Sequence, residues 1–374
     1  MSIHLVLALT LLQGATVRSS TVVLVLYAVD LGAQPLTIGI LGAMFSMFPM
    51  LLAVQAGKLA DRFAARGLLM VGAAVGTLGL LLPYFVPGLP AIFMAAALIG
   101  MLVVTFNVSL QNLVGLLSSP QDRAKNFSNY SLMGSASHLV GPLIAGFSID
   151  LSGHATACLY LALLSLAPIG MLGVRGGALT GGGRQAKHAS GGIRSMLSEP
   201  GIQRTLATSS LLHAGNSLYQ IYMPVYAHSV GLAASTIGVV LALNSAAEMV
   251  VRLILPSLIV RFKEEKVLAY AFYLEAASLM MIPFFGNAVM LALMSFIFGL
   301  GMGCCGPIVT ILMFSRSAEG RSGEGLGLKI TVNHLTKVVS PVVFGAMGSA
   351  FGLFPLFWIN ALMMAVGGFL SRAK

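Results

Sequence analysis

"GKLADRFAARG", residues 57–67, is the first charged stretch of a very apolar chain, and it contains Lys58, Asp61, Arg62 and Arg66. Apolar runs at 37–56 and 68–87 lie on either side of it. Each run is long enough to cross the hydrocarbon core of a bilayer as a helix, which takes about 20 residues. The stretch is therefore predicted to be a cytoplasmic turn between two membrane helices, held at the lipid surface by its basic residues.

The whole chain has the composition of a membrane protein. Of its 374 residues 57% are hydrophobic and 9% are charged, and the mean hydropathy is +0.93, whereas a soluble domain has about 25% charged residues. At about 30 residues for each helix and its connection, the length suits about twelve helices, and the alternating strands of a β-barrel are absent. We expect an all-α polytopic membrane protein with apolar spans at 4–30, 37–56, 68–87, 90–117, 126–149, 155–174, 205–229, 236–259, 267–286, 288–314, 325–350 and 353–371.

The basic residues predict the orientation. Counted from a cytoplasmic N-terminus, the loops on one side contain nearly all the Lys and Arg, while the opposite loops, such as "LGAQPLT" and "DLSGHA", contain none. By the positive-inside rule both termini are cytoplasmic. We expect an integral membrane protein of the bacterial inner (plasma) membrane, and the net charge of +10 reflects topology and contact with anionic lipid, with no nucleic-acid partner.

An internal repeat divides the chain. "LGAQPLTIG" at 31–39 matches "VGLAASTIG" at 230–238, an offset of 199 residues, and the same offset places Pro142 and Gly146 on Pro341 and Gly345. One offset that holds at separate places predicts two pseudo-symmetric halves of six helices, 1–174 and 205–374. Residues 175–204, rich in Gly and Ser, are predicted to be a cytoplasmic linker.

Residues 57–67 resemble the signature of the major facilitator superfamily, Gly-x-Leu-Ala-Asp-Arg-x-Gly-Arg-Arg. Ala64 and Ala65 replace the usual Gly and first basic residue. The resemblance implies a transporter of twelve helices that works by alternating access. It also implies a conformational latch on the cytoplasmic side, formed by Gly57, Asp61, Arg62 and Arg66 with the repeat-related Arg123 and Arg321.

A second stretch, "SHLVGPLIAG" at 137–146, resembles the Gly-Pro motif of the antiporters in that superfamily. Gly141, Pro142 and Gly146 match, while Ser137 and Ala145 stand where Gly is usual. A Gly-Pro pair in a membrane helix kinks it and permits close packing. The motif indicates either antiport or helix packing alone.

Charged residues within the spans point to a binding site, because ionisable groups at bilayer depth are costly. The resemblance implies a central cavity, and three of these residues would make it cationic: Arg18, Arg252 and Lys337. We therefore predict a small organic anion, such as a carboxylate, as substrate. Glu248 or His334 would carry a coupled proton. Glu248 and Arg252 are four residues apart and could instead neutralise each other.

Neutral polar residues complete the predicted substrate site: Asn107, Asn216, Asn244 and Asn333. Each could equally make a hydrogen bond between helices. The three cysteines lie within predicted spans, so no metal, disulfide framework or cofactor is expected. We expect a monomer whose partners are its small-molecule substrate and membrane lipid.

Three other functions compete with an organic-anion transporter. A multidrug/proton antiporter of the same superfamily usually has an Arg in helix four, and residues 98–115 have no basic residue. "GRSG" at 320–323 resembles the nucleophile motif of intramembrane serine proteases, but its loop position would expose Ser322 to the cytosol. A sensor or scaffold on the same fold is the third alternative.

Overall fold

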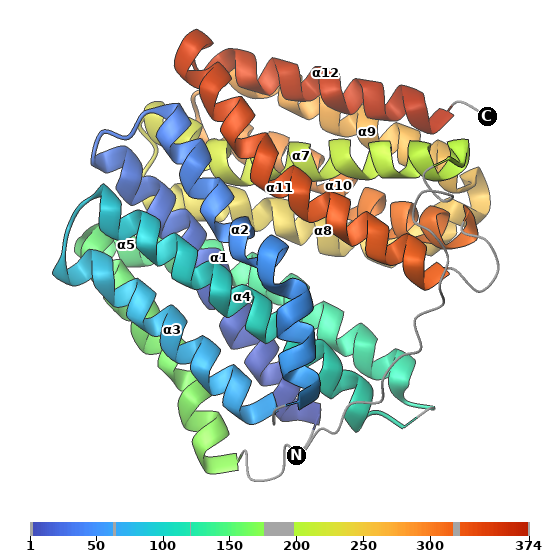
Figure 1. Cartoon of the computed structure of the whole chain (residues 1–374). Coiled ribbons are helices and arrows are strands. Elements are labelled where there is room, and N and C mark those ends of the chain that lie inside the picture. The colour runs from blue at the N-terminus through green and yellow to red at the C-terminus, as the bar shows by residue number, and fades with distance from the viewer. Residues whose placement is uncertain (1–2, 63–64, 120, 176–197, 317–321, 373–374) are drawn as a thin grey trace. The chain divides into compact units, whose positions relative to one another are not determined.

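The fold is a set of long helices separated by short turns (Figure 1). The computed structural model describes residues 3–62, 65–119, 121–175, 198–316 and 322–372. Within them lie eleven α-helices and a 3-10 turn at Ile282–Phe284. The helices are α1 (Ile3–Asp30), α2 (Pro35–Arg62), α3 (Ala65–Phe85), α4 (Leu89–Leu117), α5 (Arg123–Arg175), α7 (Pro200–Ser229), α8 (Ala234–Phe262), α9 (Glu264–Met281), α10 (Ala288–Arg316), α11 (Ser322–Phe351) and α12 (Leu353–Arg372).

These helices coincide with the expected spans. The spans 126–149 and 155–174 both fall in α5, which consists of two helices on either side of Gly153. Gly153 has φ 78° and ψ 170°, a conformation that residues with a side chain rarely adopt. The repeat offset of 199 places Gly153 on Gly352, which has φ 85° and separates α11 from α12. The two parts of α5 therefore correspond to α11 and α12.

One expectation about the opening stretch is wrong. Residues 57–62 continue α2 to Arg62, and α3 begins at Ala65, so most of the predicted turn is helical. Amphipathic residues at the end of a membrane helix can extend it beyond the hydrocarbon core, since the backbone stays hydrogen-bonded there.

The chain forms two compact units. Unit 1 comprises Met1–Gln34, Ile40–Ala186 and Ala233–Ala242, and unit 2 comprises Pro35–Gly39, Lys187–Leu232 and Leu243–Lys374. In unit 1, α1 packs against α5 and α3 against α4, around buried Leu9, Leu69 and Phe106. In unit 2, α9 packs against α10 and α12, and α7 against α11. The predicted division at residues 174 and 205 remains a prediction, and most of the expected linker lies outside the described residues.

Small residues bring helices close together at two repeat-related crossings. In unit 1 a side chain at Gly146 would meet the Ala234 carbonyl of α8, and one at Gly238 would meet the Pro142 carbonyl of α5. In unit 2 the equivalent positions, 199 residues apart, behave alike: Gly345 lies against the Pro35 carbonyl and Gly39 against the Pro341 carbonyl. Each unit thus contains one tight crossing between a first-repeat and a second-repeat helix.

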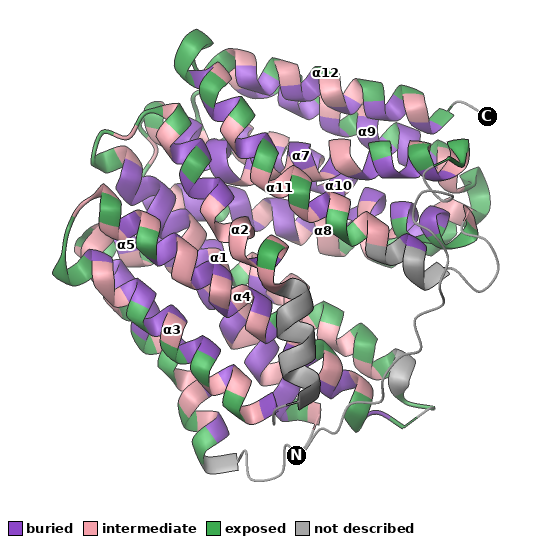
Figure 2. Ribbon diagram, viewed as in Figure 1, coloured by how far each residue is buried: buried purple, intermediate pink, exposed green. Residues whose placement is uncertain are grey.

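The outer surface of the helices is apolar. Figure 2 shows exposed residues along helices such as α12, and these include Leu362 (66% exposed) and Phe369 (68%). Among the described residues, nine helices are long and apolar enough to cross a membrane. Lipid is the solvent that tolerates such a surface.

Candidate functional site

The polar side chains of unit 2 gather on α7 and α11. Of the long α-helices in the described part of the chain, these two alone fall short of the composition of a membrane span. Buried Ser209 on α7 donates a hydrogen bond to Asn333 Oδ1 on α11 at 2.8 Å. The predicted Asn333 therefore joins the two helices.

Four basic side chains lie together on this helix pair. His213 on α7 is in electrostatic range of Lys329, His334 and Lys337 on α11. The Nδ1 atoms of His213 and His334 are buried and have no hydrogen-bond partner among the described residues. Lys329 donates to Thr310 Oγ1 at 2.6 Å. In a low-dielectric setting the two lysines of this cluster create a positive potential that favours an anionic ligand.

Glu248 and Arg252 on α8 form an ion pair. Arg252 Nη2 donates to Glu248 Oε2 at 3.1 Å, and the two side chains are 37% and 12% exposed, respectively. The pair is the i, i+4 contact that their spacing allows. One guanidinium has five donors, so Arg252 retains capacity for a further acceptor while it is bound to Glu248.

Arg18, in unit 1, faces a histidine. Its Nη2 lies 2.7 Å from His138 Nε2. Guanidinium only donates hydrogen bonds, so Nε2 must accept and His138 must be neutral in this contact. Next to it, Ser19 Oγ donates to the Gly141 carbonyl at 2.7 Å, and Gly141 lies against Arg18 Cβ and the Ala15 carbonyl. The predicted Gly-Pro motif therefore provides close helix contacts on two sides, at Gly141 and at Gly146.

The remaining predicted asparagines have different surroundings. Asn244 Nδ2 donates to the Ser295 carbonyl at 3.4 Å, a contact between α8 and α10. Asn107 is exposed on α4. The buried Oδ1 of Asn216 on α7 has no hydrogen-bond partner within the described residues. Asn216 is thus the predicted asparagine best suited to contact a ligand near His213.

The predicted latch is only partly described. Arg66 Nη2 donates to the Gly173 carbonyl at 3.2 Å, which ties the start of α3 to the end of α5. Gly57, Asp61 and Arg62 lie in α2, and Arg123 begins α5, but their side chains lie outside the described part. Arg321 lies outside the described residues altogether.

Two residues near the tight crossings make contacts that the sequence did not predict. Asp150 of α5 accepts hydrogen bonds from the Ala234 and Ser235 backbone N–H groups at 3.1 and 2.9 Å, which caps the N-terminus of α8. Tyr222 donates to the Pro341 carbonyl at 2.9 Å. Asp150 carries one of the few charges in the predicted outer loops, and this rarity is a sequence signal from which a specific contact could have been predicted.

Comparisons with known proteins agree with this architecture. A family model described as the Major Facilitator Superfamily matches residues 205–373, and curated proteins give no match. A crystal structure of a mutant of the nucleoside transporter NupG is similar with a TM-score of 0.87 at 13% identity, covering 99% of this chain and 98% of that one.

Two further solved structures have the same fold. One is a POT family transporter in complex with a thioalcohol-conjugated peptide (TM-score 0.78, 10% identity, 98% of this chain and 94% of that one). The other is a bacterial homologue of the human lysosomal transporter Spinster in an inward-facing and occupied conformation (TM-score 0.81, 10% identity, 98% and 95%). The C-terminal part of the chain therefore resembles the Major Facilitator Superfamily, and the whole chain has the fold of these transporter structures.

Proposed function

We propose that this protein is a transporter of the Major Facilitator Superfamily, a secondary active carrier of a small organic anion that works by alternating access and is coupled to protons or to a counter-anion. The observation that supports this substrate class is the basic cluster of His213, Lys329, His334 and Lys337 on α7 and α11. Ionisable groups within membrane helices are retained where they bind ligands or ions. A cluster of one sign attracts the opposite charge and repels lipophilic cations.

Lys337 is the proposed anchor for the anion, and Asn216, whose buried Oδ1 has no partner among the described residues, is proposed to accept a hydrogen bond from a substrate hydroxyl. A lysine ammonium is a compact charge with three donors, which suits one carboxylate oxygen or several. His334 is three residues from Lys337 and lies on nearly the same helix face, so a proton on its imidazole would strengthen anion binding. Release of that proton on the other side of the membrane would weaken anion binding, which couples the movement of the proton to that of the substrate.

The Glu248–Arg252 pair offers a second coupling group. Protonation of Glu248 removes the charge that holds the Arg252 guanidinium, and a substrate carboxylate can then take its place bidentately. Arg18 is proposed to behave alike, because protonation of His138 abolishes its acceptor at Nε2. In this proposal Arg18 and Arg252 bind substrate only after a proton has entered, whereas Lys337 requires none.

A melting-temperature screen of the purified full chain against organic anions and lipophilic cations tests the proposal. A ligand at 100 times its dissociation constant stabilises the folded state by about 2.7 kcal/mol. Carboxylates should raise the melting temperature of the wild type and of Lys125→Gln, a matched variant at an exposed lysine. Lys337→Gln should lose the shift.

Stabilisation by lipophilic cations alone would replace the proposal with the multidrug/proton antiporter. The sequence feature that supports that alternative is the Gly-Pro motif. Close packing at the helix crossings also accounts for this motif. Unchanged anion shifts in Lys337→Gln and Arg252→Gln would exclude these two residues from the site.

A further inference from the structure

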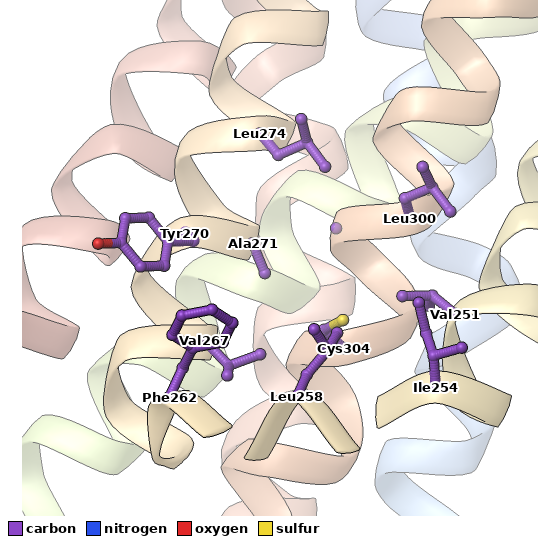
Figure 3. A pocket seen from close by; sticks show the side chains of 11 residues that line it. Val251, Ile254, Leu258, Phe262, Val267, Tyr270, Ala271, Leu274, Leu300 and Cys304 are labelled. Carbon is purple, nitrogen blue, oxygen red and sulfur yellow. The ribbon is translucent and has the colours of Figure 1, made fainter. Parts of the chain in front are cut away.

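An apolar pocket of about 360 Å³ opens on the surface of unit 2 between α8, α9 and α10. Its wall includes Val251 and Leu258 of α8, Ala271 and Leu274 of α9, and Leu300 of α10, which converge in Figure 3. The pocket is open to the surroundings, since Leu274 is 39% exposed. Its volume falls in the range of ligand sites, about 300–1,000 Å³. The predicted transport site on α7 and α11 does not use it.

Two aromatic residues of this pocket have an arginine on their rings. Phe262 lies at the end of α8, and the Arg261 guanidinium carbon is 5.3 Å from its ring centroid. Tyr270 of α9 is 55% exposed, and the Arg372 guanidinium carbon is 5.3 Å from its ring centroid. In Figure 3 the Tyr270 hydroxyl points away from the other labelled side chains. The apolar pocket is therefore bordered by two cations that are themselves exposed.

The charge around this border is positive. Among the described residues, neither Arg261 nor Arg372 takes part in an ion pair, while Arg316 pairs with Glu265. Lys263 and Lys266 are exposed between and beside these groups, and Glu264 is the remaining carboxylate of the turn. Cations thus outnumber carboxylates at the end of α8, the start of α9 and the end of α12.

We propose that this pocket binds one anionic diacyl phospholipid, with an acyl chain against the apolar wall and the phosphate between Arg261 and Arg372. Helix ends lie at the level of lipid headgroups, where basic pockets between membrane helices recognise anionic lipids. The apolar wall supplies burial of the chain, and the arginines supply the preference for negative charge. A zwitterionic lipid also buries its acyl chain against the apolar wall, but it has no net negative charge for the arginines to prefer.

Native mass spectrometry of the full chain in detergent tests the proposal directly. The protein is incubated with equal amounts of phosphatidylglycerol and phosphatidylcholine that have the same acyl chains. One phosphatidylglycerol molecule should stay bound in preference. Arg261→Gln and Arg372→Gln should each lower this preference about fivefold, which corresponds to about 1 kcal/mol per cation. Lys125→Gln removes an exposed cation at the start of α5 and should leave the preference unchanged.

The pocket itself is tested by Leu274→Trp, which fills it and leaves every cation in place. This variant should lose the bound lipid, while Leu253→Trp, at an 82% exposed position of α8 outside the pocket, should retain it. Glycerol 3-phosphate at millimolar concentration should not displace the lipid, because it has no acyl chain. Melting temperatures monitor the folding of every variant.

Equal retention of the two lipids would overturn the proposal, as would an unchanged preference in both arginine variants. Retention of phosphatidylglycerol by folded Leu274→Trp would exclude this pocket. The outcome is independent of the transport proposal, since none of the variants replaces Glu248, Arg252 or a residue of α7 or α11.

Discussion

Gly238→Ala should destabilise the protein, although alanine is the better helix former. Gly238 lies where α8 crosses α5 in unit 1, and a methyl group there would meet the carbonyl oxygen of Pro142, with the carbonyl carbon 3.2 Å away. Both neighbours are backbone atoms, so no side-chain rotation can make room. The helices must move apart or deform to accept the methyl group.

The expected size follows from two opposing contributions. Alanine is favoured over glycine inside a helix by about 1 kcal/mol, while forcing an extra methyl group into a packed site costs about 1–3 kcal/mol. The net effect of Gly238→Ala is a loss of up to about 2 kcal/mol. Gly134 provides the matched control, because it lies within α5 and an added Cβ would meet nothing within 4 Å apart from its chain neighbours and the backbone of its own helix. Gly134→Ala should gain up to about 1 kcal/mol.

Thermal unfolding of the detergent-purified full chain provides the measurement. The melting temperature should fall in Gly238→Ala and rise or stay constant in Gly134→Ala. Gly39→Ala, the repeat-related change at the crossing of unit 2, should behave like Gly238→Ala, because its methyl group would meet the Pro341 carbonyl. If Gly238→Ala raised the melting temperature as much as Gly134→Ala, the close crossing of α5 and α8 would be refuted.

Two further substitutions test electrostatic and backbone features by the same melting assay. Asp150→Asn should lower the free energy of unfolding by about 1–2 kcal/mol, because the amide keeps one acceptor oxygen for the α8 N-terminus but loses the negative charge. Asp122 makes an exposed loop contact with Ser119, so Asp122→Asn should change the free energy of unfolding by less than about 1 kcal/mol. A loss equal in the two variants would contradict the capping role. Lys263 has φ 66° and ψ 154°, a region almost reserved for glycine. Lys263→Gly should therefore raise the free energy of unfolding by about 1 kcal/mol. Lys263→Ala removes the same charge and should give no such increase. Equal melting temperatures of these two variants would argue against backbone strain at this position.

The membrane helices could be located from the sequence because the relevant signal is local. Apolar runs of sufficient length must form hydrogen-bonded helices in lipid, so every expected span coincides with a helix or with one part of α5. The repeat was also visible, since one offset relates the turn glycines and the crossing glycines of the two halves. The end of α2 was predicted too early in the chain, because hydropathy identifies only the residues within the hydrocarbon core, whereas the helix continues beyond it.

The sequence by itself determined that buried charges exist and on which helices they lie, since composition and span assignment require no knowledge of partners. Tertiary structure decided what each charge contacts. His138 lies 120 positions from Arg18, and Asn333 lies 124 positions from Ser209. Only Glu248–Arg252 could be paired in advance, because the helix repeat itself brings residues four apart to one face. Contacts between distant helices depend instead on how side chains pack at the crossings, and that packing is not encoded in any single stretch of the chain.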